Sequence, residues 1–295
     1  MEGSFGDEIS VSRPKERLSW GLPVPDDPSQ TIYVWLDALT NYLTVMGYPS
    51  KEVSTANIRH VIGKDIAKFH TIYWPLFLKE AGLPFPKDVI AHGHWLKDNQ
   101  KMSKSIGNVI CPYELLDKYG ADSVRTYMLA EGPYRKDASF LMENLHSIHN
   151  NFIADSFINM ITRIQNKKIL KKMPPNLQFT MLKPDEFSNL HAEVNHLTQV
   201  TLEQLKKADF AGAFKSIEKM VFSANQALNH YEFWVLAKSE AQNDLHLLES
   251  LLYMVFEVAR IASLLLQPYC PSVCHTMLGK LDSRTELIID FGSPV

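Results

Sequence analysis

The chain has 295 residues and a formal net charge of −3, with 45% hydrophobic and 21% charged residues. This length allows two domains, because a single hydrophobic core usually stops growing at about 250–300 residues. The composition is that of a globular protein, and the sequence contains no apolar run of about 18 residues that could span a bilayer. We therefore expect no membrane partner, and any nucleic acid would have to meet a local basic surface.

The three cysteines, Cys111, Cys270 and Cys274, are too few and too scattered for a disulfide framework or a four-ligand zinc site. We expect reduced thiols and no zinc site in this chain. The first ten residues, MEGSFGDEIS, are acidic and lack both the apolar core of a secretory signal and the arginine-rich pattern of a transit peptide. The sequence therefore carries no visible targeting signal.

Strand and helix patterns alternate over the first third of the chain. Three segments have the apolar pattern of strands: 31–39 (TIYVWLDAL), 58–65 (IRHVIGKD) and 88–96 (DVIAHGHWL). Between the last two, apolar residues recur at helical spacing over 69–81. This alternation predicts a parallel α/β sheet, in which ligands bind beyond the carboxyl ends of the strands. Four residues fall at such ends: Lys64, Asp65, His92 and Gly93.

From Pro112 onward the pattern predicts nearly continuous helix. Residues 112–130 predict two short helices that separate at Gly120, and an apolar stripe predicts one long helix over 138–169. Further helices are predicted over 187–207, 210–237 and 244–267, with QPYCP as the stop signal. The fold class is therefore α/β followed by all-α, with an α/β part over 1–111, a connecting helical segment over 112–145 and a helical bundle over 146–295.

The pentapeptide KMSKS at 101–105, followed by Ile-Gly-Asn, places two lysines three residues apart on a short segment. Ammonium groups suit phosphate oxygens, and a nearby glycine lets the backbone approach an anion closely. Both lysines could therefore reach one polyphosphate. A solvated surface loop is the alternative interpretation for an arbitrary Lys-x-x-Lys pattern.

The whole pentapeptide is identical to the signature loop of the class I aminoacyl-tRNA synthetases, and the chain resembles that family. The resemblance implies that the loop holds the ATP triphosphate while an amino-acid carboxylate attacks the α-phosphorus, and that it stabilises the charge growing on pyrophosphate. It assigns the main transition-state role to Lys104, a supporting phosphate contact to Lys101 and loop positioning to Ser103. Asp65, His92 and Gly93 complete the expected ATP site, and Mg²⁺ is expected to bind with ATP.

The segments YVWLDALTNY (33–42) and IGKDIAKFHTIYWP (62–75) resemble those that build the amino-acid pocket of methionyl-tRNA synthetases. The resemblance implies a methionine site formed by Trp35, Ala38, Leu39, Tyr42, Asp65, His70 and Trp74. Leu39 stands where several bacterial relatives have proline. A thioether is polarisable, favours aromatic edges and accepts only weak hydrogen bonds, so such a lining suits it. Taken singly, each ring could instead be an ordinary core residue.

On the predicted long helix, Asn159 and Arg163 are four residues apart and therefore share one face. By resemblance these two residues, together with Trp234, read the methionine anticodon, whose bases stack on aromatic rings. The family's usual proline before that tryptophan is replaced by Phe233. Helix packing and a solvated face are the alternatives. The basic run RIQNKKILKK (163–172) could supply local positive charge or form a solvated helix end.

The resemblance covers nearly the whole chain but corresponds to the carboxyl-side portion of a synthetase. The family's first strand, its His-Ile-Gly-His type ATP motif and its zinc-bearing insertion would lie upstream. We therefore predict a methionine-tRNA ligase with methionine, ATP and tRNA(Met) as partners, a monomer of the mitochondrial matrix by resemblance, whose present chain is weak or inactive alone. The alternatives are a noncatalytic tRNA-binding fragment and a class I synthetase for an aliphatic amino acid.

Overall fold

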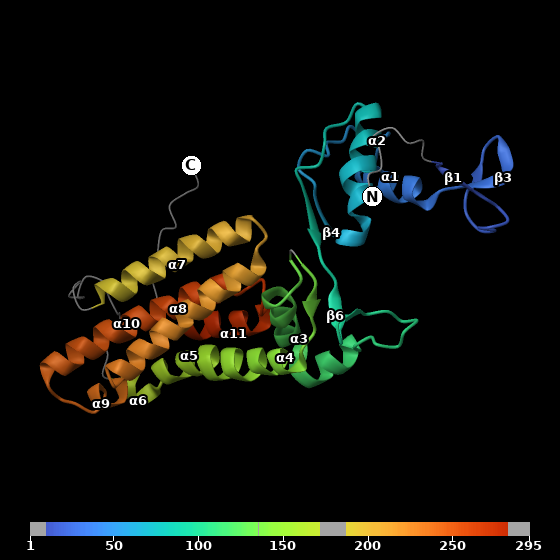
Figure 1. The fold of residues 1–295 in the computed structure, drawn as a ribbon. Helices are drawn as coiled ribbons and strands as arrows, with labels where there is room; N and C mark the ends of the chain where they lie inside the picture. The colour runs from blue at the N-terminus through green and yellow to red at the C-terminus, as the bar shows by residue number, and fades with distance from the viewer. Residues whose placement is uncertain (1–9, 135, 172–186, 283–295) are drawn as a thin grey trace. The chain divides into compact units, whose positions relative to one another are not determined.

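The computed structural model describes residues 10–134, 136–171 and 187–282 (Figure 1). The chain divides into two compact units, one ending at His94 and the other beginning at Trp95. An α/β unit is followed by a mostly helical one, as the sequence predicts. Within the described residues, no helix combines the length and the apolar character needed to cross a bilayer.

The first unit begins with a small antiparallel sheet of β1 (Ser12–Pro14), β2 (Pro23–Val24) and β3 (Asp27–Ile32), in the order β1-β3-β2. Helix α1 (Val34–Met46) follows almost at once. The predicted strand over 31–39 is therefore wrong beyond Ile32. Its apolar residues have helical as well as strand spacing, and Leu39 and Leu43 point into the core one turn apart.

Two parallel strands, β4 (Arg59–Gly63) and β5 (Asp88–His92), carry the predicted α/β character of this unit. They are joined by η1 (Lys64–Ile66), the π-helical η2 (Phe69–Tyr73) and α2 (Trp74–Glu80), which confirms the predicted helix over 69–81. Because Gly63 pairs with His92, both strands end at the same sheet edge. The hydrophobic core here is small, and its buried members are Leu39, Leu43, Trp74 and Leu78.

The second unit begins with a three-stranded sheet in the order β7-β6-β8. Its strands are β6 (Trp95–Lys97), β7 (Gln100–Lys101) and β8 (Ala138–Ser139). The single strand predicted over 88–96 is therefore two strands in two different sheets, because the chain leaves the first sheet after His92. A two-residue turn, Asp98-Asn99, joins β6 to β7 with positive φ at both residues. Asn and Asp tolerate that conformation better than other non-glycine residues.

Helices make up the rest of this unit: α3 (Pro112–Ala130), α4 (Met142–Ser147), η3 (Ile148–Ile158), α5 (Asn159–Ile164), α6 (Lys167–Leu170), α7 (Ser188–Lys206), α8 (Phe210–His230), α9 (Phe233–Leu236), α10 (Gln242–Leu265) and α11 (Pro271–Asp282). The predicted break in the first of them is confirmed, since Gly120 has φ 74° and ψ 161°.

Three details of the helix prediction are wrong. The long helix begins at Met142, because Ala138 and Ser139 pair with β6 instead. The helix predicted over 210–237 breaks after His230, where Glu232 adopts a left-handed conformation with φ 43°. The stop at QPYCP is confirmed, because α10 ends at Leu265, but the sequence missed α11, which begins at the last residue of that segment, Pro271, since proline is well tolerated at a helix start.

A single large core holds the bundle together. Helix α10 is buried on almost every side over its second half, and α8 packs against both α7 and α10 (Figure 1). The last helix is tied back to α3 by polar contacts: the Asp122 carboxylate accepts a hydrogen bond from the Val273 amide at 2.6 Å, and Arg125 donates to the Pro268 carbonyl at 2.5 Å. The bundle is thus closed by residues far apart in sequence.

Candidate functional site

The KMSKS loop continues from strand β7, whose last residue is Lys101. The loop turns back on itself, because the amides of Ile106 and Gly107 both donate to the Ser103 carbonyl, at 3.2 and 3.1 Å. Gly107 has φ 73°, a backbone conformation that favours glycine. The Lys101 and Lys104 side chains are both exposed. The structure therefore presents two ammonium groups at the surface of a short, tightly turned segment.

Asn108 closes this loop, although the sequence motif gave it no role. Its Oδ1 accepts a hydrogen bond from the Ser103 amide at 2.8 Å, and its Nδ2 donates to the Lys101 carbonyl at 3.3 Å. The Ser103 hydroxyl lies 2.8 Å from the Ser105 hydroxyl. Ser103 thus has a positioning role in the fold of the loop, and Asn108 holds both ends of the segment between the two lysines.

Three predicted ATP contacts lie in the first unit, at the edge where β4 and β5 end. Asp65 is in η1, directly after β4, and its carboxylate folds over Gly63 so closely that a Cβ at Gly63 would lie 2.7 Å from it. His92 ends β5 and donates from Nδ1 to the Gly93 carbonyl at 2.8 Å. His92 is exposed whereas Gly93 is buried. The strand register brings these residues to one edge, as predicted.

Four of the residues predicted to contact methionine form one ring cluster between α1, η2 and α2. The Trp35 ring stacks on Phe69 with 3.9 Å between centroids and meets His70 edge-on at 6.3 Å. Tyr42 lies 5.8 Å from His70 and 5.6 Å from Trp74. Of the other predicted residues, Leu39 is buried in the core and Ala38 is exposed on α1.

Hydrogen bonds fix the ring orientations in this cluster. The Tyr42 hydroxyl lies 2.9 Å from His70 Nε2, and His70 Nδ1 lies 3.0 Å from the Ile66 carbonyl. Trp74 is completely buried and donates its indole N–H to His60 Nε2 at 3.1 Å. His60 is the residue that sequence reasoning missed here, because its place on a predicted strand gave no reason to associate it with residues of the helices.

The predicted anticodon residues lie around α5, at the end of the continuous helix formed by α4, η3 and α5. Arg163 donates from Nη2 to Asn229 Oδ1 at 3.0 Å, and its guanidinium lies 5.0 Å from the Phe233 ring. Burial lowers the pKa of the Arg163 guanidinium from its ordinary value. Phe233 is buried and meets Trp234 edge-on at 5.6 Å, while Trp234 is 41% exposed. Phe233 thus bridges Arg163 and Trp234.

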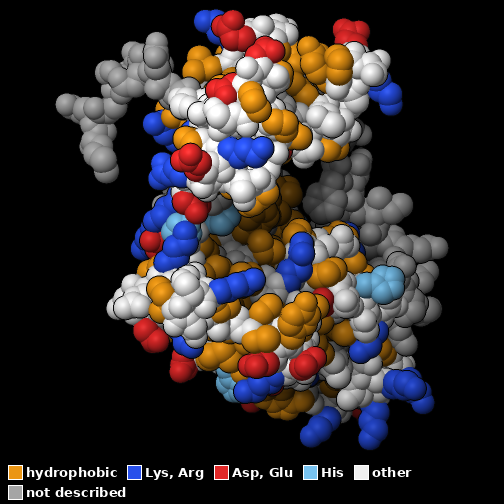
Figure 2. Space-filling model, turned by 90° about the vertical axis from the view of Figure 1, so that its right-hand side faces the viewer, with side chains coloured by type: hydrophobic (Ala, Val, Ile, Leu, Met, Phe, Trp, Pro, Cys, Tyr) orange, Lys and Arg blue, Asp and Glu red, His pale blue; other side chains and the backbone are white. Residues whose placement is uncertain are grey.

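Asn159 is exposed and begins α5, one turn before Arg163. The shared face that the spacing predicts is therefore preserved, because both residues lie in one regular helix. Lys and Arg side chains on the face seen in Figure 2 are interspersed with acidic and hydrophobic ones, without one continuous basic patch.

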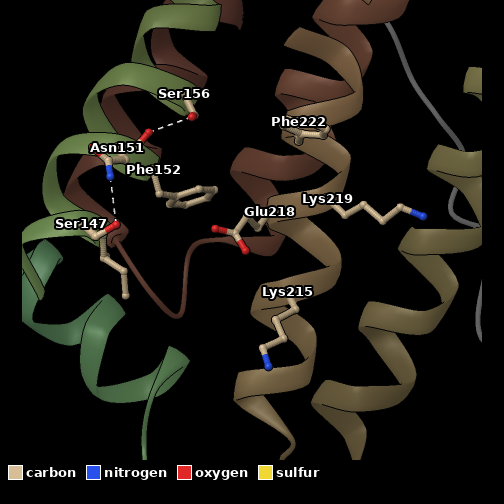
Figure 3. Close-up of a pocket in the computed structure, with 9 residues that line it drawn as sticks. Ser147, Asn151, Phe152, Ser156, Lys215, Glu218, Lys219 and Phe222 are labelled. Atoms are coloured by element: carbon tan, nitrogen blue, oxygen red, sulfur yellow. Dashed lines mark hydrogen bonds between the residues drawn. The ribbon is translucent and has the colours of Figure 1, made fainter. Parts of the chain in front are cut away.

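A groove of about 370 Å³ lies between η3 and α8, and no sequence signal pointed to it (Figure 3). Phe152 and the Glu218 carboxylate face each other across it, whereas Lys219 extends away toward α7, where it pairs with Glu193 at 3.0 Å. Burial raises the pKa of Glu218 from its ordinary value. The groove is lined by Ser147, Ile148, Asn151, Phe152, Ser156, Lys215, Glu218, Lys219 and Phe222. The groove thus combines two lysines and one glutamate with two phenylalanine rings.

Comparison with known proteins identifies the family of this chain. The family described as "tRNA synthetases class I (M)" matches residues 7–165, which is more than half of the chain. The chain belongs to the methionyl group of the class I tRNA synthetases. The resemblance seen in the KMSKS loop and in the ring-bearing segments is therefore confirmed at the level of this family.

Relatives within the methionyl group come from mitochondria and from bacteria. The probable mitochondrial methionine-tRNA ligase of Dictyostelium discoideum is 36% identical over 95% of this chain and 50% of its own length. The Mycobacterium leprae methionine-tRNA ligase is 35% identical over 95% of this chain and 52% of its own length.

A solved structure of Mycobacterium tuberculosis methionyl-tRNA synthetase in complex with methionyl-adenylate matches with a TM-score of 0.82 and 34% identity, over 92% of this chain and 54% of that one. The match confirms the predicted fold class of an α/β part followed by a helical part. The chain spans about half the length of the curated relatives it matches.

Proposed function

We propose that this chain is the carboxyl-side part of a methionine-tRNA ligase, which activates methionine with ATP and transfers it to tRNA(Met). The observation that carries the proposal is the ring cluster around Tyr42 and His70, present in the same chain as a KMSKS loop closed by Asn108. The cluster is rich in aromatic edges, and its Tyr42 hydroxyl and Trp74 indole N–H are already paired with imidazoles, which suits a thioether that accepts only weak hydrogen bonds. An aliphatic amino acid would give no reason for two indoles, a phenol and the His70 imidazole at this place.

In this proposal the KMSKS loop acts on the phosphates. Lys104 and Lys101 neutralise the negative charge that develops on pyrophosphate as the methionine carboxylate attacks the α-phosphorus. Asp65 binds the amino group of methionine or the ribose, and His92 and Gly93 border the nucleotide. Mg²⁺ is usually held by substrate phosphates with few protein ligands, and when bound it adds further positive charge there.

The helical bundle is proposed to read the anticodon. Trp234 offers a half-exposed ring on which a base can stack, and Arg163 and Asn159 offer donors to base edges or phosphates. Phe233 supports the position of both Arg163 and Trp234 through ring contacts. Stacking on one ring typically contributes about 1–3 kcal/mol per base.

The decisive experiment is methionine-dependent ATP–pyrophosphate exchange, measured on this chain joined to the upstream sequence of its own gene. We expect exchange in the extended protein and a loss of about 10²–10³-fold in rate for Lys104→Ala, because the lysine acts on transition-state charge. Lys97→Ala, on β6 outside the loop, is the matched control. An extended protein that folds but catalyses no exchange with any amino acid would reject the proposal.

A noncatalytic tRNA-binding module is the second candidate. It is favoured by the large buried core of the described part of the bundle, which does not depend on residues of the first unit. This candidate predicts that the chain alone binds tRNA and that Trp234→Ala weakens binding about tenfold without any ATP turnover. Equal binding to tRNAs of every anticodon would exclude specific recognition.

We also propose that the protein works as a monomer in the mitochondrial matrix. The named relatives include a mitochondrial methionine-tRNA ligase and a bacterial one, and the proposed location rests on the mitochondrial relative. Imaging of the tagged full-length gene product tests the location, and light scattering of the purified chain tests the monomer.

A further inference from the structure

His60 is a buried titratable residue to which neither the sequence motifs nor the proposed reaction gives a role. It is 5% exposed and lies on the buried face of β4 together with Ile62, because alternate residues of a strand point to one side. Its ring meets three others: Tyr42 at 4.6 Å, His70 at 5.4 Å and Trp74 at 6.4 Å between centroids. All three partners are residues that the proposed function assigns to the methionine site.

The hydrogen bond between Trp74 and His60 determines the protonation of the imidazole. An indole N–H can only donate, so His60 Nε2, 3.1 Å away, must accept. His60 is therefore neutral and carries its proton on Nδ1. Trp74 is completely buried, and without this acceptor its N–H would be an unsatisfied donor in the core.

The same reasoning applies to His70 on the other side of the cluster. Its Nδ1 faces the Ile66 carbonyl at 3.0 Å, and a carbonyl only accepts, so Nδ1 carries the proton. In the neutral ring Nε2 then accepts from the Tyr42 hydroxyl at 2.9 Å. Two imidazoles, 5.4 Å apart between centroids, thus hold one indole and one phenol.

We propose that His60 is a positioning residue for the methionine side chain, which holds the Trp74 indole and the Tyr42 ring in the orientation that receives a thioether. The inference rests on the proposed function, because it takes those rings to be walls of the site. A thioether is held mainly by contacts with its surroundings, and these weaken steeply when a wall moves by a fraction of an ångström. His60 acts through Trp74, so it is not a catalytic residue.

Equilibrium dialysis of radiolabelled L-methionine against the 295-residue chain tests the role. His60→Phe keeps a ring but removes the acceptor, and we expect it to weaken methionine binding about tenfold, the effect of leaving one buried donor unpaired. His60→Gln retains an acceptor and is expected to stay within about threefold of wild type. Ile62→Val, on the same face of the same strand, is the matched control and should leave the affinity unchanged.

A double variant separates positioning from general support of the fold. Trp74→Phe removes the donor of the same hydrogen bond. The double variant His60→Phe/Trp74→Phe should therefore bind methionine with about the affinity of whichever single variant binds it less tightly. If the losses of methionine affinity in the two single variants instead multiply in the double variant, His60 does not act through the indole, and the inference is overturned. Binding by His60→Phe equal to wild type would also overturn it, while leaving the proposed function intact.

A measurement that needs no ligand separates a failure of the positioning role of His60 from a failure of the proposed methionine site. In ¹⁵N-labelled chain the Trp74 indole proton, assigned with Trp74→Phe, should exchange slowly with solvent in wild type and in His60→Gln, and much faster in His60→Phe. The same exchange rate in all three proteins would overturn the inference. A wild-type chain with the protected indole but no methionine binding would instead contradict the proposed methionine site, and the positioning role would fall with it.

Discussion

At the scale of single residues, the buried His60 imidazole connects the stability of the first unit to solution pH. Burial is the main cause that lowers the pKa of His60 from its ordinary value of 6.5, and the nearby His70 lowers it further. The titratable groups whose rings face His60 are Tyr42 on α1 and His70 on η2. His60 therefore stays neutral in the folded unit at pH values where the unfolded chain already binds a proton.

The sign of the resulting pH dependence follows from linkage. Because the unfolded chain binds more protons than the folded one below pH 6.5, stability rises with pH in that range and is lost as the pH falls from 6.5 toward the lowered pKa. We expect the first unit to melt at a lower temperature at pH 5 than at pH 7.5. Thermal unfolding followed by near-ultraviolet circular dichroism measures this, and His60→Gln should flatten the dependence.

Asn108 gives a second prediction at this scale. Asn108→Ala removes the acceptor of the Ser103 amide and the donor to the Lys101 carbonyl, so the KMSKS loop should open. Hydrogen exchange of the Ser103 amide should become faster by about fivefold, since one hydrogen bond contributes about 1 kcal/mol. Ser105→Ala is the control, and unchanged protection in Asn108→Ala would show that the loop holds its shape without the clamp.

The sequence could predict the lysines of the loop but not the residue that closes it. KMSKS is recognisable as a contiguous string, whereas the role of Asn108 depends on a chain reversal that brings it back to Lys101. His60 was missed for a related reason. Its importance comes from partners on α1, η2 and α2, and strand periodicity shows only that it is buried.

At the scale of elements, the break between α8 and α9 determines which aromatic ring is buried. Glu232 has φ 43° and ψ 54°, and after it Phe233 points inward while Trp234 is exposed. A straight continuation of α8 would place these two rings at other angles around the helix axis. No glycine marks the break, which explains why the apolar periodicity predicted one helix through position 237.

This backbone conformation can be tested directly. A β-branched residue in the left-handed region is strained, so Glu232→Val should lower the free energy of unfolding by about 1–2 kcal/mol. Glycine adopts the region without strain, so Glu232→Gly should change stability by less than about 1 kcal/mol. Urea unfolding of the bundle measures both, and a valine variant as stable as wild type would mean that the break has another cause.

The α/β elements show where local patterns are ambiguous. The segment TIYVWLDAL suits a strand by composition, but Leu39 and Leu43 bury one side of a helix against Trp74 and Leu78. Tertiary packing therefore overrode the preference of the branched residues. The sequence predicts a helix where η2 lies and a parallel sheet where β4 pairs with β5. It does not predict the π-helical pitch of η2 or the pairing register of the strands, because both depend on side-chain contacts.

At the scale of the whole molecule, the two units differ greatly in their cores. Among the described residues, the buried cluster of the helical unit includes residues from α3 to α11, whereas that of the first unit has four buried members. In the first unit Val61, in the middle of β4, is 67% exposed. Stability from apolar burial scales with the area removed from water, so the two units should not be equally stable.

We therefore expect two unfolding transitions in this chain. The amides of β4 and β5 should lose hydrogen-exchange protection at a lower urea concentration than those of α8 and α10, because local stability follows burial. A fragment covering 95–295 should keep the second transition and lack the first. One cooperative transition for all amides would show that the units stabilise each other.

The tie between Asp122 and the Val273 amide has a consequence for biosynthesis. These groups are 151 positions apart, and α3, which carries Asp122, begins shortly after the KMSKS loop. A ribosome adding about 5–20 residues per second needs about 8–30 s to pass from one to the other. During that interval the helix nearest the loop exists without the contact that anchors it. A nascent polypeptide that ends before Pro268 would lack both polar ties to α3, and α3 would then be held by its packing against α4, η3 and α8.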